Sequence, residues 1–482
     1  MKKLFILIFL LSVCFNPGFS QILSKSSYKF LSDPEPGIKS NSISDIVIVD
    51  ENTIWIGTGK GLSKTEDGGA TWATYSRKQG IGRGGVSAIA VKDSLTWVAT
   101  AIDTLFNGEH WPAGGGLSYS LDNGATWNFV GQPLPGGDWT VINNVTYDIA
   151  IIDSTVWVAS FGGGLMKSSD MGQTWDVRPP DNYNFNPDEY YNHRVFSLLA
   201  VGDTLWCGTA EGVNVSYDAG ETWETQFTHQ NQDEPIAGNH VVAFCYQKTA
   251  DKQIIWAATA NTEDPTEYRA VSKTEDSGLT WSADLRGKFT YNFSCSGSNV
   301  YAATDSGLWK SPDYGETWDV FPQIIDIDNN EKFYTIEYYS VGVAPSKTLW
   351  VGSSDGLASS ADNGTNWTIY RSFVKPGKSG EPRVYAYPNP FSPLRHNQIG
   401  GDGFIRFQFN TTTNTSAKVR IFDFAMDLVT TVEGGSFSAN QDYVIPWNGK
   451  NEDGKLLANG VYFYQLDLEG EGKFWGKVII ID

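Results

Sequence analysis

The chain has 482 residues, a formal net charge of −20, 14% aromatic residues and only 19% charged residues. Together with 50 glycines, this composition is typical of a large all-β protein with many tight turns, and it disfavours a helical or disordered chain. An acidic surface repels phosphate backbones and anionic lipid headgroups. We therefore expect neither a nucleic-acid nor a membrane-surface partner.

Residues 1–20 have the pattern of a signal peptide. Lys2 and Lys3 precede the apolar run 4–13, and the small residues Gly18 and Ser20 precede the expected cleavage site. The run is too short to span a bilayer, and no later segment is long and apolar enough for a transmembrane span. The pattern predicts an exported protein.

Three cysteines remain after cleavage, Cys207, Cys245 and Cys295. No pair has metal-ligand spacing, and each lies in an apolar, strand-like run. We therefore predict that all three are free and pack as small apolar side chains.

One motif, Ser/Thr-x-Asp-x-Gly-x-x-Trp, occurs seven times between Thr65 and Trp367. In such a motif the Asp caps a tight hairpin by accepting backbone N–H groups, the Gly supplies a positive φ, and the Trp packs against neighbouring strands. The motif therefore predicts structural, not catalytic, carboxylates. These are Asp67, Asp122, Asp170, Asp218, Asp276, Asp313 and Asp362.

A second signature, an aromatic residue followed by small residues, precedes each copy of the motif. It starts at Trp55, Trp97, Trp157, Trp206, Trp256, Tyr301 and Trp350. Alternating apolar runs lie further upstream, so each repeat predicts four antiparallel strands with the motif at the last turn. Seven such sheets around an axis form a propeller. Residues 28–31 resemble an additional outer strand.

The repeat resembles the Asp-box, or BNR, repeat of sialidases, sortilin-type receptors, xyloglucanases and photosystem assembly propellers. The resemblance implies an all-β, seven-bladed β-propeller over residues 21–372. The Phe-Arg-Ile-Pro motif of sialidases is absent from the sequence, and the propeller region has few arginines. Xyloglucanases place two catalytic Asp residues in a cleft between two propellers, whereas this chain has one set of repeats.

Strand polarity assigns the long insertions to one face of the predicted propeller, opposite the motif turns. They are residues 76–85, 101–116, 128–144, 178–194, 224–240, 260–270 and 319–338. Long loops on a rigid scaffold commonly carry function. The predicted ligand-binding residues on this face are Trp111, Trp139, Tyr183, Tyr190, Tyr191 and Arg194. Aromatic rings among carboxylates and amides suit sugar rings, and they also suit protein interfaces.

Two alternatives concern the acidic residues. The inserted carboxylates could form the acid/base pair of a glycoside hydrolase. They are Asp138, Asp188, Glu189, Asp233, Glu234, Asp264 and Glu267. The spacing from Asp326 to Glu337 partly matches a calcium loop, but Glu331 replaces the required Gly, so we predict a solvated acidic loop. We assign no catalytic residue, metal or cofactor.

The last hundred residues form a separate unit in the sequence. A Pro/Gly-rich linker covers residues 373–382, and the alternating strands and hairpin glycines of residues 383–482 predict a β-sandwich of about seven strands. Blocks such as Tyr387–Phe391 and Trp447–Gly454 resemble the FlgD-like Ig-type domain and the C-terminal sorting domain of type IX secretion substrates. The resemblance implies that the secretion machinery is a partner, and that the protein is secreted or attached at the cell surface.

These patterns favour a secreted recognition protein whose propeller binds a glycan. Two alternatives stay open, a glycoside hydrolase and a protein-binding scaffold in envelope assembly. A close pair of inserted carboxylates in a deep cleft would favour the enzyme.

Overall fold

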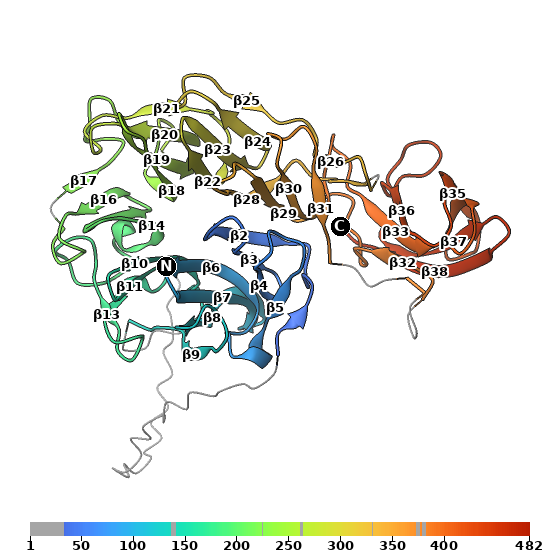
Figure 1. The fold of residues 1–482 in the computed structure, drawn as a ribbon, viewed down its shortest axis with the longest axis horizontal. Coiled ribbons are helices and arrows are strands. Elements are labelled where there is room, and N and C mark those ends of the chain that lie inside the picture. The colour runs from blue at the N-terminus through green and yellow to red at the C-terminus, as the bar shows by residue number, and fades with distance from the viewer. Residues whose placement is uncertain are drawn as a thin grey trace, which may run out of the picture.

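The structure is a computed structural model that describes residues 33–135, 141–223, 225–260, 264–329, 331–372, 376–377 and 382–482. The described residues contain β-strands and two short 3-10 turns, η1 (Arg77–Gln79) and η2 (Tyr191–His193), but no α-helix. A ring of sheets is followed by a β-sandwich (Figure 1).

Seven sheets each contain four antiparallel strands, which we call A to D from the innermost outward. The A strands are β2 (Ile43–Ile48), β6 (Gly85–Lys92), β10 (Thr146–Ile152), β14 (Val195–Val201), β18 (His240–Lys248), β22 (Thr290–Ser296) and β28 (Tyr338–Val343). The B strands are β3 (Ile54–Thr58), β7 (Leu95–Phe106), β11 (Thr155–Ser160), β15 (Thr204–Thr209), β19 (Gln253–Ala260), β23 (Asn299–Thr304) and β29 (Leu349–Ser353).

The outer strands complete each blade. The C strands are β4 (Gly61–Thr65), β8 (Glu109–Ser120), β12 (Gly164–Ser168), β16 (Gly212–Ser216), β20 (Ala270–Thr274), β24 (Gly307–Ser311) and β30 (Gly356–Ser360). The D strands are β5 (Ala73–Tyr75), β9 (Asn128–Gly131), β13 (Asp176–Val177), β17 (Thr225–Phe227), β21 (Ser282–Asp284), β25 (Asp319–Val320) and β31 (Thr368–Tyr370).

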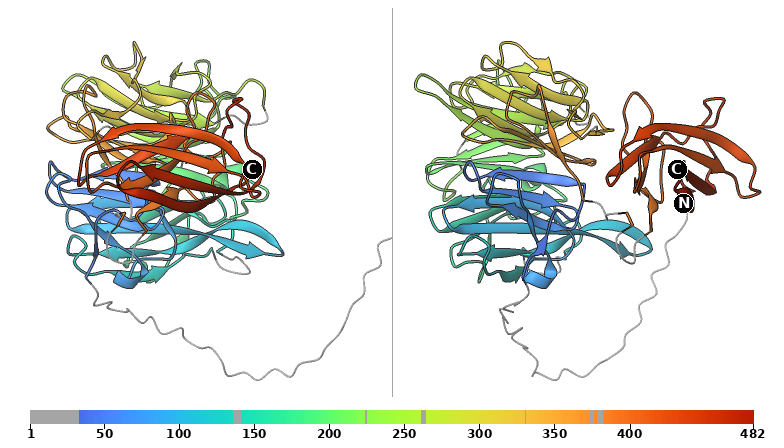
Figure 2. Two further views of the ribbon diagram at one scale, coloured as in Figure 1. Left: turned by 90° about the vertical axis from the view of Figure 1, so that its right-hand side faces the viewer. Right: turned by 45° about the vertical axis from the view of Figure 1, so that its right-hand side comes forward.

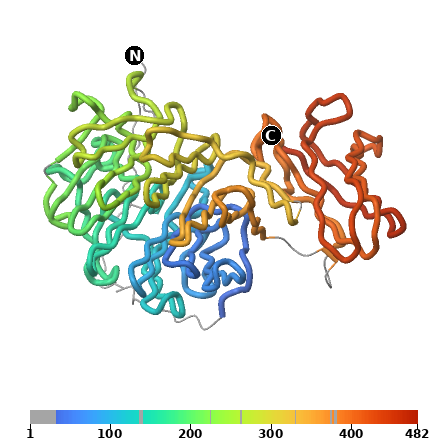
Figure 3. Tube along the Cα trace, turned by 45° about the horizontal axis from the view of Figure 1, so that its top comes forward, coloured from blue at the N-terminus to red at the C-terminus, as the bar shows by residue number. Residues whose placement is uncertain are grey.

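The ring closes through neighbouring A strands. Each A strand packs beside the next, and β28 packs beside β2. The chain returns to its starting point in Figure 3, where the orange segment of blade 7 lies beside the blue segment of blade 1. The described chain begins with β1 (Glu35–Pro36), which adds a fifth strand outside β5. The extra strand predicted at residues 28–31 lies outside the described residues.

Each copy of the repeat motif has the same pattern of hydrogen bonds, with Asn366 in place of the donor Thr in blade 7. In blade 4, the Asp218 carboxylate accepts the backbone N–H and the side-chain hydroxyl of Thr222 at 2.8 and 2.6 Å. The buried N–H of Gly220, however, donates to the Ser216 hydroxyl at 2.8 Å. The carboxylate therefore accepts the hydrogen bonds at the exposed end of the turn. The hydroxyl at the first motif position accepts the buried backbone N–H, and the sequence did not reveal this role of the hydroxyl.

The motif also joins neighbouring blades. Trp127 of blade 2 packs edge-on against Trp55 of blade 1, with ring centroids 6.0 Å apart. Gly124 has a φ of 90°, and a Cβ atom there would lie 2.5 Å from the Trp55 ring. The motif glycine is thus required by close packing as well as by its backbone conformation.

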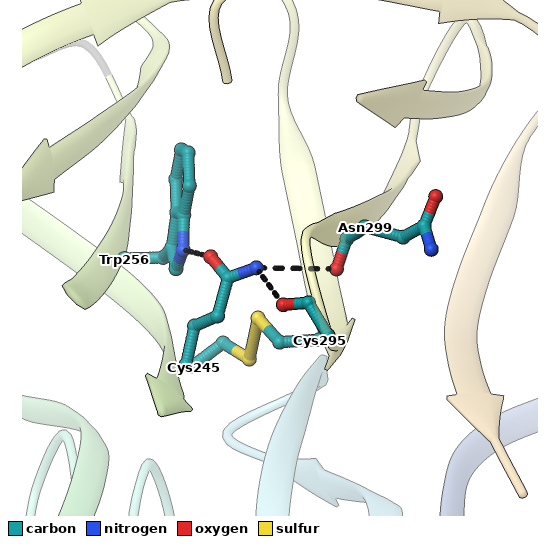
Figure 4. The surroundings of a disulfide bond; sticks show 6 residues. Cys245, Trp256, Cys295 and Asn299 are labelled. Atoms are coloured by element: carbon teal, nitrogen blue, oxygen red, sulfur yellow. Dashed lines mark hydrogen bonds between the residues drawn. A yellow bond between two sulfur atoms is a disulfide. The ribbon is translucent and has the colours of Figure 1, made fainter. Parts of the chain in front are cut away.

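Cys245 of β18 and Cys295 of β22 form a disulfide, so the prediction of three free cysteines is wrong for this pair. The bond links the A strands of blades 5 and 6, which the sequence separates by 50 residues. Figure 4 shows Trp256 beside it, and the indole N–H of Trp256 donates to Gln247 at 2.9 Å. Cys207 is free and buried.

The segment that partly matched a calcium loop forms a hairpin of β26 (Ile325–Asp326) and β27 (Glu331–Lys332). Asp326 is buried, and it accepts the N–H groups of Asn329 and Ile369 at 2.9 and 3.0 Å. The prediction that this loop is solvated is therefore wrong at Asp326, because its carboxylate is buried and hydrogen-bonds the hairpin to the outer strand of blade 7.

The C-terminal domain is a sandwich of a three-stranded and a four-stranded sheet, in the orders β32-β33-β36 and β35-β34-β37-β38. Its strands are β32 (Val384–Tyr387), β33 (Ile405–Asn410), β34 (Thr415–Phe422), β35 (Leu428–Phe437), β36 (Asp442–Trp447), β37 (Gly460–Leu468) and β38 (Gly472–Ile480). Apolar side chains from both sheets form one core. The predicted fold class, a seven-bladed β-propeller followed by an Ig-like β-sandwich, is confirmed.

A buried ionic cluster joins the sandwich to blade 7. Asp355, in the turn between β29 and β30, pairs with Arg406 of β33 and with Arg371, and all three side chains are almost inaccessible to solvent. Tyr334 packs against Phe404 with ring centroids 4.8 Å apart, and Arg406 lies over the Tyr334 ring at 4.8 Å. The sandwich is thereby held beside blade 7 (Figure 1).

Candidate functional site

The alternation of strand directions defines two faces of the propeller. The motif turns lie on one face, which we call the motif face. The A strands begin on the other face, where the B–C connections also lie, and we call this the insertion face. The connection predicted at residues 101–116 is an extension of β7 and β8, and Figure 2 shows this hairpin (cyan) projecting from the body of the propeller.

Every A strand has a register shift near its first residues, as in β10 between Thr146 and Asp148 and in β14 between Val195 and Ser197. The residues within the shifts are Ser44, Ser87, Tyr147, Phe196, Val242, Tyr291 and Tyr339. A bulge interrupts the alternation of a strand and re-aims a side chain. Four of the seven residues are aromatic, and all seven lie where the A strands begin.

Around blades 3 to 5, the bulge residues Tyr147 and Phe196 belong to a connected set of rings and one guanidinium, which we call the aromatic run. It comprises Tyr147, Phe161, Tyr191, Arg194, Phe196 and His240. Phe196 contacts Tyr147, Phe161 and His240, with ring centroids 5.8, 6.2 and 4.7 Å apart. The Arg194 guanidinium lies between Phe161 and Tyr191, at 5.1 and 4.4 Å from their ring centroids.

The aromatic run is accessible at two of its rings. Tyr147 is 42% exposed and Tyr191 is 56% exposed, whereas the other four side chains are half-buried. Burial lowers the pKa of His240, which keeps its imidazole neutral and able to stack on Phe196 at neutral pH. The arrangement offers stacking surfaces beside one fixed cation.

A fully buried histidine, His193, holds the insertion that carries Tyr191 in place through hydrogen bonds. The Nδ1 atom of His193 accepts the N–H of Asn186 at 2.9 Å, so Nε2 carries the proton and donates to Asp181 at 3.0 Å. Tyr183 and Tyr190 stack at 4.9 Å with a 10° interplanar angle, and the Tyr183 side chain is exposed. A rigid base therefore holds the tyrosines of this insertion.

A second set of rings lies where blades 6 and 7 begin. The hydroxyls of Tyr291 and Tyr339 donate to the two carboxylate oxygens of Glu337, at 2.5 and 3.2 Å, and Tyr291 contacts Phe289. Burial and the adjacent Glu337 raise the pKa of Tyr339 to about 12. Both phenols are therefore hydrogen-bond donors at neutral pH.

Glu337 and Tyr339 border a cavity of about 650 Å³ between the propeller and the C-terminal domain. We call it the inter-domain cavity. Asp305 and Ser354 also line its propeller side, and the loop with Arg395 and His396 lines its other side.

The predicted ligand-binding residues separate into three groups. Tyr191 and Arg194 belong to the aromatic run, and Tyr183 and Tyr190 form the stacked pair at the base of the same insertion. Trp111 lies on the projecting hairpin, partly buried and paired opposite Thr104. Trp139 lies outside the described residues.

The sequence patterns did not indicate Tyr147, Phe161 and Phe196, nor Tyr291 and Tyr339, as site residues. Four of them lie in A strands that were assigned to the scaffold. The available signal was an aromatic residue recurring at the same position near the start of four A strands, where three other strands carry Ser or Val.

The inserted carboxylates do not form a typical acid/base pair. Asp264 and Glu267 both accept from the Gln230 amide, at 3.3 and 3.0 Å. Glu267 is buried and binds the backbone N–H and the side-chain amide of Asn239 at 2.9 Å. Hydrogen bonds from Thr266 lower the pKa of Asp264, whereas a general acid needs a raised pKa.

The other inserted carboxylates in the described residues are solvent-accessible. Asp188, Glu189, Asp233 and Glu234 are exposed on loops, and Asp138 lies outside the described residues.

Within the described ranges, no group of three or more His, Cys, Asp or Glu side chains could hold a metal ion. No helix in the described part of the chain is long and apolar enough to cross a membrane.

Residues 396–472 match the family described as FlgD Ig-like domain. No curated protein sequence matches the chain. Among solved structures, the GH74 xyloglucanase from Xanthomonas campestris is similar at 12% identity over 79% of this chain and 59% of that chain, with a TM-score of 0.51. The GH74 enzyme of Niastella koreensis is similar at 14% identity over 95% of this chain and 75% of that chain, with a TM-score of 0.50.

PorZ, a bacterial surface component of the type-IX secretion system of Porphyromonas gingivalis, is also similar. It shares 15% identity over 92% of this chain and 66% of that chain, with a TM-score of 0.35. At such identities the two GH74 structures show the fold alone, a β-propeller.

Proposed function

We propose that the chain is an exported recognition protein whose propeller binds a glycan on the insertion face, through the aromatic run. The single observation that carries this proposal is the connected set Tyr147, Phe161, Phe196, Tyr191 and Arg194, with two exposed rings. Sugar rings stack their C–H faces on such side chains, while a cation and nearby amides bind hydroxyl groups.

Binding without hydrolysis is favoured over a glycoside hydrolase. Asp264 and Glu267 are engaged in loop hydrogen bonds, and the lowered pKa of Asp264 is opposite to that of a general acid. We also propose that the seven motifs are Asp-boxes with a structural role, because each carboxylate accepts hydrogen bonds from its own turn.

A glycan array with the full mature chain tests this function, with released reducing ends assayed on the retained glycans. The expected result is retention of a defined set of glycans with no new reducing ends. Release of reducing ends would favour the hydrolase, and retention of no glycan would favour a protein-binding scaffold.

We further propose that the C-terminal domain directs type IX secretion. The signal peptide pattern and the FlgD Ig-like match over residues 396–472 support this role. Deletion of residues 383–482 should leave the protein inside the cell envelope, which fractionation of the producing bacterium would show.

The matched control for this deletion is Arg406→Ala, which removes the buried ion pair with blade 7 and leaves the sandwich in the chain. This variant should still reach the cell surface or the medium. Normal export of the deletion variant would contradict the sorting role.

A further inference from the structure

The inter-domain cavity has two walls from different domains. The propeller contributes Asp305, Glu337, Tyr339 and Ser354, and the C-terminal domain contributes Arg395 and His396. A cavity of about 650 Å³ falls within the size range of small-ligand sites. It borders the insertion face, because Glu337 and Tyr339 lie at the beginning of the blade 7 A strand.

The propeller wall presents acceptors in a fixed geometry. Tyr291 and Tyr339 bind the two oxygens of Glu337, which orients the carboxylate and leaves its remaining lone pairs for a ligand. Asp305 adds a second carboxylate, held by the N–H of Phe289 at 3.3 Å and the Arg269 guanidinium at 3.6 Å. Two carboxylates on one wall disfavour an anionic ligand.

The opposite wall presents donors. The Nδ1 atom of His396 accepts the N–H of Ser392 at 3.0 Å, so the neutral imidazole carries its proton on Nε2. Arg395 is exposed beside it and brings a guanidinium with five donors. Acceptors and the Tyr339 ring on one wall and donors on the other match the hydroxyl groups and C–H faces of a sugar.

We infer that the inter-domain cavity binds the end of an uncharged glycan, so that the C-terminal domain completes the ligand site of the propeller. This inference rests on the proposed glycan binding by the aromatic run, and it adds the ligand class and a second contact region. The carboxylates of Asp305 and Glu337 disfavour uronic and sialic acids at this position. The sandwich then has a role in recognition besides export.

The test uses the full mature chain and isothermal titration with two probes, neutral xyloglucan oligosaccharides and acidic oligogalacturonates. The wild type should bind only the neutral probe. Glu337→Gln and Arg395→Ala should each weaken that binding about tenfold, because each removes a charged hydrogen-bonding partner. Arg395→Ala changes an exposed side chain and therefore leaves the fold intact.

Lys455→Ala is the matched control, because it removes an exposed cation of the same domain that does not line the cavity. It should bind the neutral probe with wild-type affinity. Wild-type affinity of both cavity variants, together with loss of binding in Tyr191→Ala, would overturn the cavity assignment and leave the proposed function standing. Binding of the acidic probe by the wild type would overturn the ligand class, and absence of binding to both probes would overturn the inference.

Discussion

Asp355→Ala should lower the unfolding free energy by about 3–5 kcal/mol, because it leaves buried cations without their shared anion. The Asp355 carboxylate forms an ion pair with Arg406. It also accepts hydrogen bonds from the Arg371 guanidinium at 3.2 Å and from the backbone N–H of Tyr334 at 2.8 Å. Burial raises the pKa of Asp355, and the Arg406 guanidinium opposes this rise. Urea unfolding followed by tryptophan fluorescence would measure the loss.

The same substitution should uncouple the two domains, since Arg406 belongs to the sandwich and Asp355 to blade 7. We expect the single transition of the wild type to separate into two, one for each domain. A variant that combines Asp355→Leu with Arg406→Met replaces the pair by apolar side chains and should recover most of the stability. An Asp355→Ala protein that unfolds at the urea concentration of the wild type would show that the cluster does not hold the domains.

The second large effect is a fall in stability of about 3 kcal/mol as the pH rises from 4 to 7. Burial raises the pKa of Asp148 to about 7 and that of Asp45 to about 6. The Asp148 carboxylate accepts the N–H of Leu198 in the next blade at 2.8 Å. Both carboxyls lie on A strands and keep partial solvent contact. We therefore expect the unfolding free energy to change by less than these pKa shifts would give in full.

The sign follows from proton binding. Between pH 4 and 7 the folded protein retains protons on Asp148 and Asp45 that the unfolded chain has released, so rising pH favours unfolding. The motif carboxylates act in the opposite sense at lower pH. Hydrogen bonds from Thr222 lower the pKa of Asp218 to about 2, so its contribution is complete above pH 4 and is lost as the pH falls towards 2.

Asp148→Asn removes the contribution of the Asp148 carboxyl to this pH dependence, because an amide does not titrate. The slope between pH 4 and 7 should become shallower, so the variant should gain stability relative to the wild type as the pH rises from 4 to 8. Asp153→Asn is the control, since Asp153 is exposed in the same blade and its positive φ suits asparagine. Equal slopes for wild type and Asp148→Asn would contradict this assignment.

The repeats predicted the scaffold because each blade uses the same local physics. An aromatic residue with small neighbours forms the B strand, and the motif forms the turn between strands C and D. The face of the insertions also follows from strand polarity alone. These features depend on nearby residues, which is why a single sequence shows them.

The details of the site depend on register and on contacts between blades. One extra residue at the start of β14 places Phe196 among Tyr147, Phe161 and His240, and strand alternation alone does not show such a bulge. The Cys245–Cys295 disulfide likewise depends on two A strands lying side by side. The inter-domain cavity depends on how the sandwich docks, which no local pattern encodes.

A matched pair of tyrosines tests the central claim, that the insertion face binds the ligand. Tyr191 on the insertion face and Tyr217 in a motif turn on the motif face are each 56% exposed. In titrations of full-length protein with a glycan retained by the array, Tyr191→Ala should weaken binding by about 2 kcal/mol, as for a stacked aromatic anchor. Tyr217→Ala should bind as the wild type does. Loss of affinity in Tyr217→Ala with wild-type affinity in Tyr191→Ala would place the ligand on the motif face and contradict the account.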